Sequence, residues 1–199
     1  MKDITQNEMS MVLRILKSPH TPYNANSIAK PMGISAMGAL KIARRLEKED
    51  ILISKKMGHA HFFGLNLKSA YVRQYIKFLL MREARQAPPY VRAWLGDLQK
   101  IKSADAAILY GSVLQRQKEA NDIDVLFILD IRRLSALQGE IDKINQVALK
   151  RIHALFQTRE DFIRNIKKED KPLLNALKGV VVFGEDVIIR GLSDEPRGK

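Results

Sequence analysis

The sequence contains no cysteine among its 199 residues. Disulfide cross-links, thiolate catalysis and cysteine-ligated zinc are therefore excluded. The longest uninterrupted apolar runs are about five or six residues, far below the ~20 that a membrane-spanning helix needs. Residues 1–5 also lack the apolar stretch of a signal peptide. Together these absences predict a cytoplasmic protein with no membrane partner.

Positive charge is abundant but unevenly distributed along the chain. The formal net charge is +12, and residues 1–104 hold 18 Lys+Arg against 7 Asp+Glu, whereas residues 105–199 hold 16 against 15. This asymmetry predicts a nucleic-acid-binding face on the N-terminal half and a different task for the C-terminal half. A basic surface that is merely solvated is the alternative.

The first 66 residues have the pattern of three helices followed by a β-hairpin. Residues Thr5–Glu8 have capping-box spacing and open the first helix. Gly33 can close a second helix that begins near residue 24 or 26, and Ser35 can cap a third that runs to about residue 50. Residues 51–56 and 60–65 are expected to pair as two strands around a glycine turn.

This order of elements resembles the winged helix-turn-helix domain of transcription regulators. The segment Ser27–Ser35 is typical of the turn before a recognition helix, although Pro31 departs from the pattern and predicts a short, late-starting or bent second helix. The resemblance implies that the third helix enters the major groove of double-stranded DNA and that the hairpin contacts the backbone. A winged helix used only for protein contacts is the alternative. The implied DNA-binding residues are Met37, Lys41, Arg44 and Arg45 in the groove and Lys48, Lys55 and Lys56 at phosphates.

A helical linker is predicted between this domain, residues 1–67, and the second domain, residues 104–192. Residues 68–86 form an amphipathic helical pattern with Tyr71, Tyr75, Phe78 and Leu79 near one face, and a further helix over about 90–100 carries Trp94 as a core or interdomain anchor. The linker, residues 68–103, can serve homodimerisation. Stacking of its aromatic residues on single-stranded nucleic acid is a less favoured alternative.

The C-terminal half opens with a motif that points to a nucleotide and a metal ion. A buried strand over 106–110 leads into Gly111, which allows a sharp turn, and Ser112 stands where a short helix begins. Asp122 and Asp124 then start an apolar strand over 123–129. Because strand side chains alternate, the two carboxylates project from one face and form half of a site for a hard cation such as Mg²⁺.

The remaining pattern predicts a small mixed sheet covered by helices, so that the whole chain belongs to the α+β class. Helices are expected over 135–151, from Thr158 onward, and over 172–177. Strands are expected over 153–157, 179–184 and 187–189, and residues 193–199 are expected to be a polar tail.

The spacing of Gly111–Ser112 and Asp122–Asp124 resembles the Gly-Ser…Asp-x-Asp signature of the DNA polymerase beta-like nucleotidyltransferases, especially the minimal ones. The segments 157–162 and 179–184 also resemble the end of that group. The resemblance implies that Gly111 and Ser112 hold the triphosphate of a nucleoside triphosphate substrate. It implies that Asp122 and Asp124 are catalytic and bind Mg²⁺, and that a third carboxylate on a later strand completes a two-metal site.

Three departures from that signature bear on function. The Ser112-to-Asp122 spacing is one residue shorter than the commonest form, and the usual Arg-Gly pair is absent, so that Arg116 is the expected substitute for contacting phosphates. The strand over 153–157 holds no acid. The candidate substitutes for the third carboxylate are Asp130, Glu160 and Asp161.

Two functions are therefore expected. The first is transfer of a nucleoside monophosphate to a partner protein's hydroxyl, as in toxin–antitoxin pairs of this family, or to a nucleic-acid end. The second is a DNA-binding regulator with an inactive nucleotidyltransferase fold. His59 and His61 share a face of the hairpin but lack further ligands for zinc.

Overall fold

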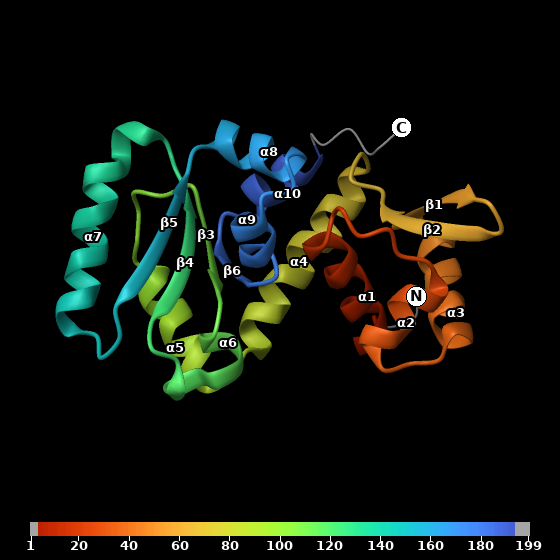
Figure 1. Cartoon of the computed structure of the whole chain (residues 1–199), viewed down its shortest axis with the longest axis horizontal. Coiled ribbons are helices and arrows are strands. Elements are labelled where there is room, and N and C mark those ends of the chain that lie inside the picture. Colours follow the sequence, from red (N-terminus) through yellow and green to blue (C-terminus); the bar gives the residue numbers. More distant parts are fainter. Residues whose placement is uncertain (1–3, 194–199) are drawn as a thin grey trace. The chain divides into compact units, whose positions relative to one another are not determined.

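The computed structural model describes residues 4–193, drawn in colour in Figure 1. The chain is of the mixed α+β class, and it divides into two compact units, Met1–Leu79 and Leu80–Lys199. Across the described residues, no helix is both long and apolar enough to cross a membrane. The predicted polar tail lies outside the described residues except for Ser193, which ends the last helix.

The N-terminal unit contains three helices followed by an antiparallel hairpin, as the sequence predicts. The hairpin is also tied to the loop between the first two helices, because the Phe63 amide donates to the Tyr23 carbonyl at 2.7 Å. The elements are α1 (Gln6–Lys17), α2 (Ala25–Met32), α3 (Ala36–Lys48), β1 (Leu52–Met57) and β2 (Ala60–Leu65).

Side-chain caps fix the ends of these helices. Thr5 and Glu8 form the predicted capping box at α1, and Asn24 forms a second one with Ser27 at α2. Gly33 ends α2 with a left-handed φ of 65° and donates to the carbonyls of the last turn, which confirms its predicted role. Pro31 lies in that last turn, and α2 is accordingly short.

The helix α4 (Ala70–Gln86) buries a different stripe from the one predicted. Its buried residues are Val72, Ile76, Leu79 and Leu80, whereas Tyr71 is 59% and Phe78 50% exposed. The predicted stripe combined Tyr71, Tyr75 and Phe78 with Leu79, and of these four only Leu79 is buried, because the stripe that packs is aliphatic. Because the division between the units falls within α4, this helix is not a free linker.

The expected linker differs from the structure at its second helix too. The helix α5 (Pro89–Leu98) packs into the core of the C-terminal unit, with Val91, Trp94, Leu95 and Leu98 buried against the strands. Trp94 is therefore a core residue of that unit. The burial of α5 places the boundary between the units earlier in the chain than the predicted start at residue 104.

The C-terminal unit is built on a four-stranded mixed sheet of order β5-β4-β3-β6. The strand β3 pairs antiparallel with β4 and β6, and β5 pairs parallel with β4. The strands are β3 (Ala106–Tyr110), β4 (Ile123–Ile128), β5 (Ile152–Gln157) and β6 (Val180–Phe183).

Helices cover both faces of this sheet, as Figure 1 shows. On one face, α5 and α7 (Leu134–Val147) pack against alternate strand residues such as Leu109, Val125 and Phe127. The intervening residues Ile108, Leu126 and Ile128 are buried on the opposite face. The helices α8 (Arg159–Lys167), α9 (Lys171–Ala176) and α10 (Glu185–Ser193) contact the strands there.

Two sequence predictions of secondary structure are wrong in this unit. Residues 187–189, predicted as a strand, lie in α10, which has Glu185 and Asp186 in its first turn and buries Ile188, Ile189 and Leu192. Acidic residues at a helix N-terminus favour helix over strand, and the spacing of the buried residues has helical period. The helix predicted to reach residue 151 ends at Val147.

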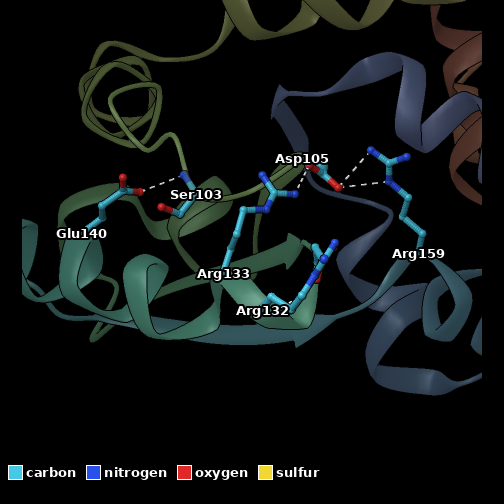
Figure 2. A network of polar contacts seen from close by, with 7 residues as sticks. Ser103, Asp105, Arg132, Arg133, Glu140 and Arg159 are labelled. Carbon is cyan, nitrogen blue, oxygen red and sulfur yellow. Dashed lines mark hydrogen bonds and ion pairs between the residues drawn. The ribbon is translucent and has the colours of Figure 1, made fainter.

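A largely buried carboxylate joins three elements at the end of the sheet where β3 begins (Figure 2). Asp105, whose side chain is 15% exposed, accepts hydrogen bonds from Arg159 at 3.0 Å and forms an ion pair with Arg133. Nearby, Glu140 of α7 accepts from the backbone amides of Lys102 and Ser103 at 3.0 and 3.1 Å. These contacts fasten α7 and α8 to the start of β3.

Candidate functional site

The candidate site is a row of three side chains across neighbouring strands. Tyr110, the last residue of β3, pairs with Asp124 of β4, and Asp124 pairs with His153 of β5. Directly opposed residues on paired strands share a face, so the phenol, carboxylate and imidazole lie side by side. Asp122 immediately precedes β4 and belongs to the same face, as the alternation of the strand predicts.

The ligand atoms in this row are close enough to share one cation. One ligand atom each from Asp122, Asp124 and His153 lie within 4.8 Å of one another. His153 Nδ1 is 3.2 Å from Asp124 Oδ1, and the Asp124 side chain is 21% exposed while that of His153 is 76% exposed. Two carboxylate oxygens and an imidazole nitrogen fit the donor set of a divalent cation.

The turn after β3 presses against the same carboxylate. Gly111 has a φ of +79°, and a Cβ at this position would lie 2.1 Å from Asp124 Oδ2. Only glycine fits, both for its backbone conformation and for the approach of the turn to the carboxylate. Ser112 follows as the residue before α6 (Val113–Arg116), and its side chain makes no capping hydrogen bond there. The backbone of Gly111 is therefore held against the Asp124 carboxylate, and Ser112 is the next residue along the chain.

The electrostatics of the row are visible at Tyr110. Burial raises the pKa of the Tyr110 phenol, and the negative charges of Asp124 and Asp122 raise it further. The phenol therefore stays protonated beside the two carboxylates at neutral pH. It adds a hydrogen-bond donor beside the two carboxylates, which only accept.

The three acids named as substitutes for the third carboxylate lie elsewhere. Asp130 follows the far end of β4, about 20 Å from Asp124 by the rise of a strand. Its carboxylate accepts hydrogen bonds from Arg132, which hold the pKa of Asp130 below its usual range. Glu160 and Asp161 stand in the first turn of α8, beyond the far end of β5. Among the described residues, the third member of the group is a histidine rather than an acid.

His153 is the site residue that the sequence analysis missed. The family signature directs attention to a carboxylate on the strand over 153–157, so the histidine that opens this strand drew no prediction as a ligand. The sequence did contain a signal for a ligand, since His153 stands at the start of its predicted strand, as Asp122 and Asp124 stand at the start of theirs. Its position opposite Asp124 depends, however, on the parallel register of β4 and β5, which the sequence alone does not fix.

The last predicted member of this site, Arg116, ends α6 and is exposed. Its backbone amide donates to the Ser112 carbonyl at 2.8 Å, one helical turn earlier. The structure thus places this residue one turn from the Gly111–Ser112 segment.

A second group of predicted residues lies on the N-terminal unit. Met37, Lys41, Arg44 and Lys48 are all exposed and follow one another on α3 at intervals of four, three and four residues, which is one face of a helix. Met37 is 73% exposed. Lys55 and Lys56 are exposed on β1. The opposite face of α3 buries Ala39, Ala43 and Leu46.

Arg45 differs from the other cations of this group. Its guanidinium forms an ion pair with the buried Glu8 of α1 at 2.9 Å and with Glu49 at 3.2 Å. It therefore ties α3 to α1, and the exposed basic stripe consists of its neighbours.

Comparison of the chain with protein-family models, with curated proteins and with solved structures finds no match.

Proposed function

We propose that the C-terminal unit is a DNA polymerase beta-like nucleotidyltransferase that moves a nucleoside monophosphate from a nucleoside triphosphate to a hydroxyl acceptor. The observation that carries this proposal is the meeting of the Asp122 and Asp124 carboxylates with the Gly111–Ser112 turn. Two acids for a cation beside a glycine turn for phosphates are the parts that a metal–triphosphate complex requires.

Each residue has a definable task in this reaction. Gly111 lets the turn pack directly against the Asp124 carboxylate, and the Ser112 hydroxyl that follows it is available to donate a hydrogen bond to a phosphate oxygen. Asp122 and Asp124 would hold Mg²⁺, which when bound neutralises phosphate charge and aligns the α-phosphorus for in-line attack. The acceptor oxygen bonds to the α-phosphorus, the bond to the β-phosphate oxygen breaks, pyrophosphate leaves, and the hydroxyl proton passes to solvent.

Label transfer tests the proposal. With Mg²⁺ and a nucleoside triphosphate labelled at the α-phosphate, we expect label to appear on a protein or nucleic-acid acceptor, whereas γ-label should leave with pyrophosphate. Asp122→Asn combined with Asp124→Asn should lower the rate by at least about 100-fold, because it withdraws several kcal/mol of transition-state stabilisation.

The matched control is Asp142→Asn, an exposed carboxylate on α7 outside the site. It should transfer label at the wild-type rate. If the double variant labels as well as the wild-type protein, the site has been assigned to the wrong residues.

A second function is proposed for the N-terminal unit, that of a winged helix which binds double-stranded DNA through α3. This proposal is supported by an exposed stripe on α3, which is the helix that follows the Gly33 turn and whose other face is buried. The stripe consists of Met37, Lys41, Arg44 and Lys48. Lys55 and Lys56 on the hairpin would contact phosphates.

Salt-dependent duplex binding tests this second function. Lys41→Ala with Arg44→Ala should weaken binding and reduce the slope of log affinity against log salt by about 0.9 for each phosphate that the variant no longer neutralises. The control, Lys118→Ala with Lys143→Ala, removes two exposed charges from the C-terminal unit and should leave the slope unchanged.

The two assays together separate the two functions. Duplex binding without any label transfer would identify a DNA-binding regulator with an inactive nucleotidyltransferase fold. An unchanged slope in the Lys41 and Arg44 variant would remove α3 as the DNA-binding element.

A further inference from the structure

His153 occupies the place in the sheet where the resemblance led us to expect a third carboxylate. It faces Asp124 across the parallel β4–β5 pair, with Nδ1 3.2 Å from Asp124 Oδ1. Asp124 in turn is confined by the backbone of Gly111. The position of the carboxylate next to the imidazole is therefore set by the sheet and the turn together.

We propose that Asp122, Asp124 and His153 form a mixed oxygen and nitrogen site that binds a first-row transition cation such as Mn²⁺ in preference to Mg²⁺. The inference rests on the proposed function only in placing the cation beside a nucleotide. The cation preference itself follows from the three side chains. It changes the expected cofactor of the site from Mg²⁺ to a first-row transition cation, for which Mn²⁺ serves as the probe.

The preference follows from the chemistry of the three donors. Mg²⁺ takes oxygen ligands, keeps several of its waters and gains little from an imidazole. Divalent manganese, iron, cobalt and zinc accept both carboxylate oxygen and imidazole nitrogen, and their affinity for such a site increases along the first row. Replacing one carboxylate of an all-oxygen site by an imidazole therefore favours a transition cation over Mg²⁺.

Three protein donors also leave coordination positions of the cation free for a nucleotide. Asp122 just before β4, Asp124 in β4 and His153 in β5 bind the cation from the side of the sheet. A six-coordinate cation such as Mn²⁺ then keeps positions for phosphate oxygens and water. The exposure of His153 at 76% means that the imidazole lies at the open rim of the site, where it can turn toward a cation.

Direct cation binding by the full chain without nucleotide tests the inference. Bound Mn²⁺ is measured from the decrease of the free-ion paramagnetic resonance signal, and Mg²⁺ is titrated as a competitor. We expect the wild-type protein to bind Mn²⁺ at least about tenfold more tightly than Mg²⁺. His153→Asp should keep a cation site but reduce this ratio by about tenfold, because it restores an all-oxygen donor set.

Two further measurements exclude misfolding of the variant and cation binding by other histidines as explanations. Co²⁺ bound to the wild-type protein should show a visible absorption spectrum that changes in His153→Asp, since a nitrogen donor is replaced by oxygen. His59→Ala with His61→Ala removes two exposed imidazoles from the N-terminal hairpin and should change neither the ratio nor the spectrum. If His153→Asp changes neither the ratio of Mn²⁺ to Mg²⁺ affinity nor the Co²⁺ spectrum, His153 only hydrogen-bonds Asp124 and the inference is wrong.

The outcome is separable from that of the proposed function. Cation selectivity that depends on His153, without label transfer from any nucleoside triphosphate, would keep the inference and remove the function. Label transfer by a protein whose cation preference does not change in His153→Asp would support the proposed function and contradict the inference.

Discussion

Tyr75 on α4 shows how a single side chain senses the charges around it. Its phenol has a pKa raised to about 12, chiefly by burial and further by the carboxylates of Glu8 and Glu49, while Arg45 opposes the shift. These are the same groups that join α3 to α1 through the Arg45 ion pairs. The phenol therefore reports on the electrostatic balance of the helical core in the N-terminal unit.

This shift predicts a loss of stability at high pH. The unfolded chain releases the Tyr75 proton near pH 10, whereas the folded chain retains it until about pH 12, so the free energy of unfolding falls as pH rises between these values. Solvent screening at a half-buried phenol limits the loss to less than about 1 kcal/mol. Urea unfolding of wild-type protein and Tyr75→Phe across this window measures it. Equal losses in both proteins would contradict the prediction.

Individual site residues are partly foreseeable from the sequence. Asp122 and Asp124 lie close together and Gly111 lies against Asp124, because a turn and the two strands beside it are local in sequence and strand alternation is regular. The position of Arg45 in the sequence, next to Arg44 and four residues after Lys41, led to its prediction as an exposed DNA-binding residue. Its ion pair with Glu8 depends on how α1 packs on α3, which spacing does not reveal.

At the level of elements, the Asp105 cluster shows how loops hold the sheet in place. One carboxylate serves Arg133, at the start of α7, and Arg159, at the start of α8. The Asp105 amide also donates to the Ile128 carbonyl at 2.8 Å, at the end of β4. The side chain thus links two helices to a residue that is itself paired with the strand.

Replacing this carboxylate should loosen the C-terminal unit. Asp105→Asn leaves two guanidinium groups without their charged partner, and we expect the free energy of unfolding to fall by about 1–2 kcal/mol. Urea unfolding monitored at Trp94, which is buried in the same unit, provides the measurement.

The matched control for this change is Asp130→Asn, which removes the partner of the exposed Arg132 nearby. It should cost much less, since ion pairs at the surface stabilise weakly. Equal losses in the two variants would mean that burial of Asp105 does not matter.

Element type is predictable where a cap or a local period marks it. The helices α1, α2 and α3 have their predicted caps at Thr5, Gly33 and Ser35. The mistake at 187–189 arises because a short run of β-branched residues suits a strand as well as a buried helix. Packing decides such cases, and Gly191 of α10 lies so close to the Phe162 ring of α8 that a Cβ would clash with it.

For the whole molecule, the predicted class is right but the chain divides differently. An α+β chain is confirmed, whereas the expected separate linker over residues 68–103 is replaced by a division within α4, because α5 is part of the C-terminal core. Amphipathicity shows that a helix packs but not which unit it packs against. The basic excess of residues 1–104 therefore extends into the C-terminal unit, through residues such as Arg92 and Lys100.

The parallel pairing of β4 with β5 has a consequence for the order in which the chain assembles. Gly111, Asp122 and Asp124 belong to a short stretch that can fold as one antiparallel strand pair, with contacts between residues close in sequence. His153 joins them only after α7 has crossed back to the sheet, and contacts that close a long loop form slowly. We therefore expect the imidazole to be the last of the four to reach its place, so that a cation that requires it binds only after β5 has paired with β4.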